Sequence, residues 1–423
     1  MRDNVVMGFR RATSGQSEPS LWRRGLAVLI AAAWLAFLGA GASADEGAKR
    51  YDGLTLDEWD VRIKAFSYSS PEAARSVPGL IEIVDDSAAP WESRRQAALT
   101  LGRMGQPART AVPHLIQLAS DARQTEETRL WALTALARFG PVGAEAAPIA
   151  GQILANSREN HLLQLAATEV LGRIGASHPA AFRALVDMLS RPAQGGPEVS
   201  RDSDLRVACT DSLALLGGAA RGAVPILLRQ MQPPGDRVRQ STLTTLASIG
   251  PGAEEAALPV AEILVSDPVP LTRDRAAEAL VQIGVTPLLI RLLEIPRAET
   301  RERVALALIR ARRPVNPLLA SAVRNAVQGD ADSAVRSAAL KTDWAWTQDA
   351  EALAPEAVAL LGSQDRIARK AGYEVLIRMG DKARIVTPTL ERLAEGNEPQ
   401  AATAARSLLR RLQGGESAAG AGA

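Results

Sequence analysis

Residues 94–121 read RRQAALTLGRMGQPARTAVPHLIQLASD, and this stretch decides the fold. Met104, Leu101 and Ala97 stand one, four and eight residues before Gly105. These offsets place the three side chains on one face of an α-helix. Gly105 allows the positive φ of a helix C-cap, and a proline eight residues later marks the first turn of a second helix. The stretch therefore predicts two helices joined by a tight turn.

The pattern recurs along the chain. Leucine stands four residues before each terminal glycine, and arginine stands eleven residues before six of the seven, with Gln164 as the exception. Neither helix of such a unit can bury its apolar stripe alone, so the units must stack. Two degenerate units fill the interval between the last two glycines. The recurring glycines are Gly105, Gly140, Gly175, Gly217, Gly250, Gly284 and Gly380.

The predicted fold class is all-α, an α-solenoid superhelix of about ten helical pairs. The expected organisation is a signal peptide over residues 1–44, a lead-in over 45–56, the repeats over 57–412 and a disordered tail over 413–423. The spacing of 42 residues between Gly175 and Gly217 marks an inserted loop at 191–204. Insertions in solenoids map to loops on one face, which is often the binding face, although a tolerated flexible loop explains the insertion equally well.

The Arg…Ala…Leu-Gly-x-Ile-Gly run and the Val-Pro-x-Leu-Ile run resemble HEAT repeats, particularly the short HEAT-like type also found in phycobilisome lyases. Residues 51–59, YDGLTLDEW, resemble a Y-x-G-x-x-L-x-x-W segment at the start of exported bacterial HEAT-repeat proteins. The resemblance covers nearly all of residues 57–412. It implies an α-solenoid that binds other proteins. The C-x-x-C-H motif of a cytochrome-like partner domain, which some such proteins carry, is absent from the sequence.

The first 44 residues predict export. An arginine-rich start precedes the apolar run LAVLIAAAWLAFL at residues 26–38, and an A-x-A site ends at Ala44. The apolar run is shorter than the ~20 residues that span a bilayer as a helix. We expect cleavage after Ala44, a periplasmic or extracellular location and no stable membrane span afterwards. The alternative is a protein tethered to the membrane through an uncleaved leader.

Charge and residue types exclude several functions. The chain has 49 basic and 47 acidic residues, and removal of the leader changes the net charge from +2 to −1, which argues against a nucleic-acid partner. A single cysteine, Cys209, excludes an internal disulfide framework and a Cys-based zinc site. The sequence contains no G-x-x-x-x-G-K-[ST], G-x-S-x-G or H-E-x-x-H motif. We therefore assign no catalytic, cofactor-binding or metal-binding residue and expect no cofactor.

The recurrent arginine has two interpretations. It could pair with acids in the first helical turn, such as Glu92, Glu127 and Asp204, and so stabilise the stack. It could instead form a basic stripe that grips an anionic partner, because repeats present equivalent residues on one continuous face. The near-neutral charge without the leader favours the structural interpretation.

The degenerate units supply the candidate partner-binding residues. Arg310, Arg312 and Arg313 cluster where a helix should end in glycine, a place that also suits cations through the helix dipole. Trp344 occupies a position that holds Gly or Ala in most units, and tryptophan is a favoured interface anchor. Trp346 falls in an apolar position, and we expect it in the core.

These observations lead to one functional hypothesis and two alternatives. We expect an exported, non-enzymatic, monomeric scaffold whose concave face binds a protein or peptide. The first alternative is an enzyme or enzyme subunit similar to the bilin lyases, which holds a small ligand in the groove. The second is an architectural envelope protein.

Overall fold

The computed structural model divides into two compact units, one ending at Ala65 and one beginning at Phe66. The predicted signal peptide, its cleavage site at Ala44 and Arg312 lie outside the residues that the structure describes. Within the described residues, no helix combines the length and apolar character needed to cross a membrane. The described residues are 48–65, 67–68, 70–175, 178–193, 199–232, 235–311 and 313–419.

The first unit explains the Y-x-G-x-x-L-x-x-W pattern. Tyr51 and Leu54 exchange backbone hydrogen bonds across a two-residue turn, in which both central residues have positive φ. Helix α2 (Leu56–Ala65) follows, and its start carries a capping box. The Thr55 N–H donates to the Glu58 carboxylate (2.8 Å), and the Glu58 N–H donates to the Thr55 hydroxyl (3.4 Å). Trp59 Nε1 then donates to the Tyr51 carbonyl (2.8 Å), which ties the turn to the helix.

The second unit is built from helix pairs and contains no strand among its described residues. A short α3 and α4 precede the first complete pair, and α23 follows the last. The helices are α3 (Pro71–Arg75), α4 (Val77–Asp85), α5 (Trp91–Met104), α6 (Val112–Ser120), α7 (Glu126–Phe139), α8 (Ala147–Ala155), α9 (His161–Ile174), α10 (Pro179–Ser190), α11 (Val199–Leu215), α12 (Val224–Gln230), α13 (Asp236–Ile249), α14 (Ala257–Ser266), α15 (Pro270–Ile283), α16 (Thr286–Glu294), α17 (Ala298–Ala307), α18 (Pro317–Gly329), α19 (Ser333–Thr347), α20 (Ala350–Leu361), α21 (Arg366–Met379), α22 (Thr387–Ala394) and α23 (Pro399–Ala419).

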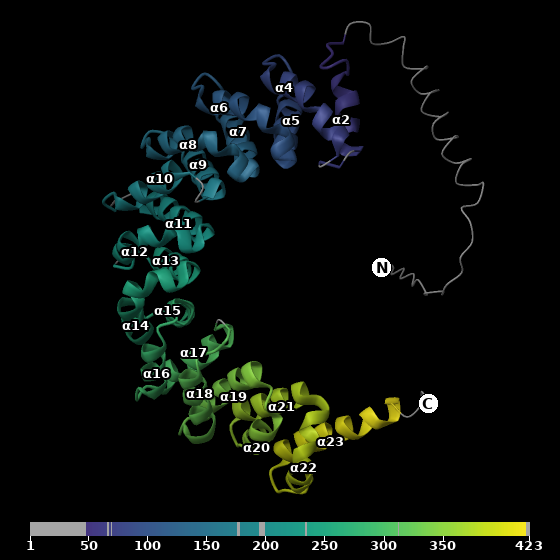
Figure 1. Cartoon of the computed structure of the whole chain (residues 1–423), viewed down its shortest axis with the longest axis vertical. Coiled ribbons are helices and arrows are strands. Elements are labelled where there is room, and N and C mark those ends of the chain that lie inside the picture. Colours follow the sequence, from purple (N-terminus) through teal and green to yellow (C-terminus); the bar gives the residue numbers. More distant parts are fainter. Residues whose placement is uncertain are drawn as a thin grey trace, which may run out of the picture. The chain divides into compact units, whose positions relative to one another are not determined.

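The pairs stack in two layers. From α5 to α21, each odd-numbered helix packs against the next odd-numbered helix and against the even-numbered helix that precedes it in the chain. Figure 1 shows the odd-numbered helices of the second unit following one another along one layer and the even-numbered helices along the other. The predicted α-solenoid of repeated helix pairs is confirmed.

Two element bounds differ from the sequence expectation. Helix α11 begins at Val199, so the last part of the expected inserted loop is helical. Helix α23 continues to Ala419, past residue 412 where the repeats were expected to end.

The terminal glycines end the odd-numbered helices as predicted. All seven have positive φ, between 53° and 82°. Six of the described connections then form a 3₁₀ turn, in which residues three apart share one side. These turns are η1 (Gln106–Ala111), η2 (Gly140–Ala146), η5 (Gly217–Ala223), η6 (Gly250–Ala256), η7 (Leu308–Arg310) and η8 (Gly380–Val386).

Small residues set the spacing between helices. A Cβ on Gly102 would lie 2.7 Å from the Ala135 carbonyl oxygen, so α5 and α7 touch at that point. Gly372 meets the backbone of α20 in the same way, because its Cβ would lie 2.8 Å from the Leu361 nitrogen. These positions tolerate no side chain without a shift of backbone.

The recurrent arginines are structural. Two of them pair with an acid in the first turn of their own helix, as expected: Arg206 with Asp202 and Arg239 with Asp236. Most of them also have a partner that was not expected. In seven units the guanidinium donates to a backbone carbonyl at or just after the end of the preceding even-numbered helix. Such carbonyls have no partner within their own helix and lie at the negative end of its dipole. We call this arrangement the arginine clamp. Its pairs are Arg94 with Val84, Arg129 with Ala119, Arg206 with Leu189, Arg273 with Asp267, Arg301 with Ile295, Arg336 with Asp330, and Arg369 with Ser363.

The clamp also reaches the following unit. Arg129 binds the Glu159 carboxylate in a bidentate manner (3.0 and 2.8 Å), and this arginine holds the pKa of Glu159 below its usual value. Arg301 binds Asp330 in the same way, with both distances 2.8 Å. At the first clamp an aromatic ring replaces the acid, since Arg94 stacks on Trp131 at 5.7 Å. The Arg94 and Arg129 clamps therefore each join three successive units.

A residue of the insertion makes up for the arginine that is absent at position 164, where the chain has Gln164. Its amide nitrogen donates to the Asn156 carbonyl (2.9 Å), near the end of α8, as an arginine would do elsewhere. Arg201, in the helical part of the insertion, donates to the Gln164 amide oxygen (2.7 Å) and to the Glu159 carbonyl (2.5 Å). The guanidinium that position 164 lacks thus comes from the next unit.

Replacing the clamp arginine in Arg129→Ala should lower the free energy of unfolding by about 3 kcal/mol, because the half-buried Glu159 carboxylate and the Ala119 carbonyl would both lose their partner. Arg138→Ala, an exposed arginine on the same helix, should change it by less than about 0.5 kcal/mol. Urea denaturation followed by circular dichroism measures both. Equal effects would show that the clamp is not a main source of stability.

The close approach at Gly372 predicts that Gly372→Ala destabilises the protein by about 1–3 kcal/mol, because α20 and α21 must separate. Gly329 ends α18 with nothing within 4 Å of its Cβ direction. Gly329→Ala should therefore be neutral or slightly stabilising, because alanine restricts the unfolded chain. Thermal unfolding of the two variants compares them, and a tolerated Gly372→Ala would contradict the tight packing.

Candidate functional site

Trp344 lies in the core of the stack, which corrects the expectation that it protrudes as an anchor. Its exposed fraction is 8%. The reason is a shift of one residue: α19 has 15 residues, and Gln348 rather than Thr347 takes the positive φ of the cap. Counted from Gln348, Trp344 occupies the buried position that holds leucine in other units. Its burial leaves little surface for a partner.

Trp346 occupies an outer position instead of the predicted core position. Counted from Gln348, it stands two residues before the cap, and it is half-buried. Its indole Nε1 donates to the Leu308 carbonyl (3.1 Å) in the preceding unit. The two tryptophans of α19 have therefore exchanged the surroundings that the sequence predicts.

The candidate arginines lie on the surface but are engaged. Arg310 has 67% of its side chain exposed and pairs with Glu278 of α15. Arg313 is exposed and donates to the Ala345 carbonyl, so it lies beside the backbone of α19 next to Trp344. Arg312 lies outside the described residues. These contacts hold the degenerate units together, and whether a partner also uses these residues stays a proposal.

A different set of arginines lines an open groove along α5, α7 and α9. Arg103, Arg138 and Arg173 each stand two residues before the terminal glycine, and all three are exposed. We call the cavity of about 570 Å³ that they line the arginine groove. Its other lining residues are Tyr68, Gly102, Thr134 and Glu169.

The groove carries more positive than negative charge. Arg103 Nη1 donates to the Tyr68 hydroxyl (2.8 Å), and its guanidinium stacks on the same ring at 5.6 Å. Arg173 Nε pairs with Glu169 at 2.8 Å. Arg138 makes no ion pair with any residue of the described chain. Three guanidinium groups thus face one carboxylate, and two of the three have no acidic partner within the groove.

The residues of this groove are not among the predicted sites, although the sequence contains their pattern. Arginine recurs at 103, 138 and 173 with a spacing of 35 residues. The arginines eleven residues before the glycine are less exposed: Arg94, Arg129 and Arg206 are buried, and the others are half-buried.

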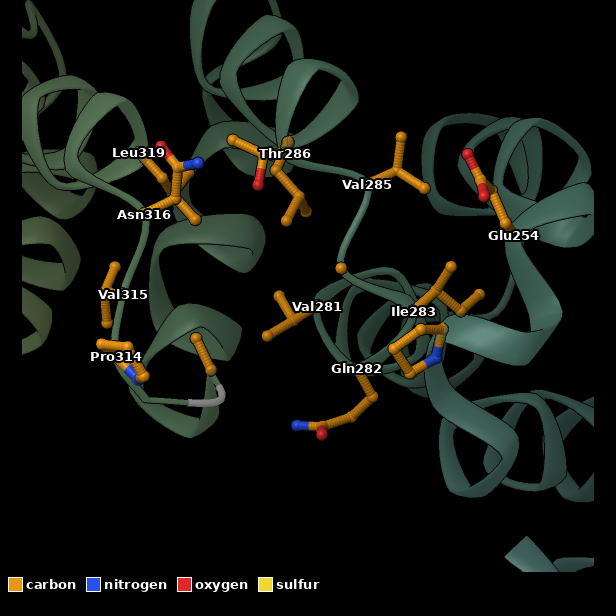
Figure 2. A pocket seen from close by; sticks show the side chains of 14 residues that line it. Glu254, Val281, Gln282, Ile283, Val285, Thr286, Pro314, Val315, Asn316 and Leu319 are labelled. Atoms are coloured by element: carbon orange, nitrogen blue, oxygen red, sulfur yellow. The ribbon is translucent and has the colours of Figure 1, made fainter. Parts of the chain in front are cut away.

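A second cavity, of about 360 Å³, lies beside the Arg310 region (Figure 2). Val281, Gln282 and Ile283 at the end of α15 line one side, and Pro314, Val315, Asn316 and Leu319 line the other. Pro251 and Glu254 of η6, together with Val285 and Thr286, complete the wall. We call this cavity the turn pocket.

Residues that bind metals or act as nucleophiles do not gather in either cavity. Among the described residues, no three His, Cys, Asp or Glu side chains are placed to hold a metal ion. Cys209 is fully buried, and burial raises the pKa of its thiol to about 12. It packs where most other units place a small residue, as predicted.

Residues 77–161 match the family model for HEAT repeats. The match spans α4 through the start of α9, and it confirms the predicted resemblance to HEAT repeats. A search of curated proteins finds no match.

Several solved helical-repeat structures are similar to this chain at low identity. Importin beta in an ammonium sulfate condition is 13% identical, covers 85% of this chain and 55% of its own, and has a TM-score of 0.47. A Kap121p mutant is 14% identical, with coverages of 81% and 42% and a TM-score of 0.43. Human deoxyhypusine hydroxylase in complex with glycerol is 19% identical, with coverages of 65% and 96% and a TM-score of 0.27. This chain spans about half the length of the first two, and at these TM-scores none of their activities or partners transfers to it.

Because Trp344 is buried, Trp344→Ala should lower the free energy of unfolding by about 3–5 kcal/mol. The truncation would leave a large cavity in the core beside α19. Trp91 is 55% exposed and stacks only on Arg95, so Trp91→Ala should cost less than about 1 kcal/mol. Thermal unfolding distinguishes them. A small effect of Trp344→Ala would restore its role as a surface residue.

Proposed function

We propose that this protein is an exported, non-enzymatic scaffold that binds an acidic polypeptide segment on the face formed by its odd-numbered helices. The arginine groove is the single observation that carries this proposal. Its cations are distributed along three successive units and do not converge on one point, which suits an extended ligand better than a reacting group. The leader sequence supports export.

The spacing of the arginines favours one conformation of the ligand. Neighbouring packed helices lie about 8–10 Å apart, so equivalent side chains on α5, α7 and α9 follow one another at about that interval. A polyproline II helix has three residues per turn and rises about 3.1 Å per residue, so every third side chain faces the same way about 9 Å further on. Acidic residues three apart in such a segment would meet Arg103, Arg138 and Arg173 in turn. Charge complementarity would then set the register of the ligand.

The proposal predicts that a labelled peptide with the sequence Glu-Pro-Ala-Glu-Pro-Ala-Glu binds the full chain more tightly than a peptide of the same composition with its three glutamates adjacent. Arg138→Glu should weaken that binding at least tenfold, and higher salt should weaken it further because the pairs are exposed. Fluorescence anisotropy measures each affinity.

Arg378→Glu is the matched control. Arg378 stands two residues before Gly380 on α21, is exposed and lies away from the groove. It should leave binding unchanged. If Arg378→Glu weakens binding as much as Arg138→Glu does, the interaction follows overall charge and the groove is not the site. Equal affinity for the two peptides would show that a spacing of three between the acidic residues does not matter, which would contradict the proposed binding register.

Export and the natural partner are tested together in the host. The tagged full-length chain is cross-linked in cells, recovered and analysed by mass spectrometry for its N-terminus and for captured proteins. An N-terminus at Asp45 together with a partner that carries acidic residues at a spacing of three supports the proposal. An intact leader in the membrane fraction would instead indicate a tethered protein.

A further inference from the structure

The 3₁₀ turns between paired helices form a third element of the repeat. Turn η2 packs on the preceding even-numbered helix α6, on the helices of its own pair and on the following odd-numbered helix α9. Turns η1 and η2 pack against each other, as do η5 and η6. The turns therefore lie in a row along one edge of the stack.

Five of these turns bury two small or slender residues that stand three apart, and the three-residue η7 is the exception. In three of these turns the first residue of the pair has non-helical φ and ψ, namely Ala108, Gly143 and Ala253. Both residues of every pair are nevertheless buried, so both face the stack. Three of the turns also carry a proline shortly before the first of these residues: Pro107, Pro141 and Pro251. The buried pairs are Ala108 with Ala111, Gly143 with Ala146, Ala220 with Ala223, Ala253 with Ala256, and Ala383 with Val386.

The turn is absent from the connection between α15 and α16. It is also absent between α19 and α20, where α20 begins at Ala350, five residues before Pro355. Helix α15 ends at Gly284, and α16 begins at Thr286, so a single residue replaces the six that separate Gly250 from α14 in the preceding unit. The turn pocket lies at this place. Pro251 and Glu254 of η6 border it on one side, and the connection of the following unit, with Pro314 and Val315, borders it on the other.

We propose that the turn pocket receives a Pro-x-small-x-x-small turn from a partner polypeptide, which fills in trans the place that five other units fill from their own chain. The floor of the pocket suits small apolar side chains, because Val281, Leu289 and Leu319 are all buried there. The rim suits a peptide backbone. The Gln282 amide, whose nitrogen already donates to the Arg310 carbonyl (2.9 Å), and the Glu254 carboxylate offer hydrogen-bonding groups at the opening.

This binding mode is independent of the arginine groove, because the two sites share no residue. The turn pocket also selects its ligand by side-chain size, whereas the arginine groove selects by charge. Side chains larger than alanine or valine at the two inward positions would not fit a space that the neighbouring turns fill with Ala, Gly or Val.

The probe is a capped peptide that copies residues 250–257, the turn of the preceding unit. It is titrated into full-length protein labelled at the Ile, Leu and Val methyl groups. We expect saturable shifts confined to methyl groups around the pocket, such as those of Val281, Leu289 and Leu319. A control peptide with leucine at both inward alanine positions should bind at least tenfold more weakly.

Two variants close the pocket in different ways. The first replaces Val285 with residues 251–256 and so restores the missing turn in cis. The second, Val315→Trp, fills the cavity from its rim without lengthening the chain. It provides the test if the variant with the grafted turn does not fold. Folding is checked by circular dichroism, and either folded variant should lose peptide binding by at least tenfold.

Three results would overturn the proposal. They are no saturable shift in the unmodified protein, equal binding of the two peptides, or unchanged binding when the pocket is closed. If the unmodified protein dimerises and the graft makes it monomeric by light scattering, the occupant is a second copy of the chain and the assignment to a partner is wrong.

Discussion

The repeat depends on a buried guanidinium that no single helix pair can satisfy. The arginine clamp takes a carbonyl from the preceding unit, and in several units it takes a carboxylate from the following one. Asp267 and Asp330 each bind two arginines. The Asp267 carboxylate pairs with Arg239 and its carbonyl accepts from Arg273. The Asp330 carboxylate pairs with Arg301 and its carbonyl accepts from Arg336. Desolvating a charge is costly unless its partners are in place. Stacking in the correct register is what supplies those partners, so the clamp links the fold of each unit to that of its neighbours.

Much of the fold could be predicted because recurring residues mark where each helix of the repeat begins and ends. The terminal glycines mark the helix ends, and in most units the arginine stands four residues after the N-cap, as at Thr125 and Arg129. Helix α11 is an exception, because it begins at Val199, seven residues before Arg206. The prediction was wrong where the two markers disagree. In α19 one extra residue lies between them, so the positions of Trp344 and Trp346 shift by one and their burial is exchanged. In α11 the class of acidic partner was right but the named residue was wrong: Asp204 pairs with Arg237, while Arg206 pairs with Asp202 in the same first turn. A guanidinium is long enough to contact the neighbouring unit. A prediction based on closeness in the sequence selects partners within the same unit and misses such contacts.

The candidate sites were harder to predict for two physical reasons. The arginines of the groove recur in the sequence, yet both they and the clamp arginines lie on the same helices. The packing of neighbouring helices determines which of the two sets of arginines faces solvent. The sequence of one helix does not reveal that packing. The turn pocket has no motif at all, since it results from residues that are absent between Gly284 and Thr286. A deletion becomes a cavity only when the neighbouring units hold the surrounding walls in place.

The pairing of Gln164 with Arg201 has an evolutionary consequence. Position 164 can lose its arginine only while the insertion provides another guanidinium, and the insertion can be lost only if arginine returns at 164. Either change alone would leave hydrogen-bonding groups at the end of α8 or the Arg201 cation without a partner. The two features should therefore be inherited together. In related chains, the length of the segment before α11 should covary with the residue at position 164, so that an apparently dispensable loop is retained by selection for stability.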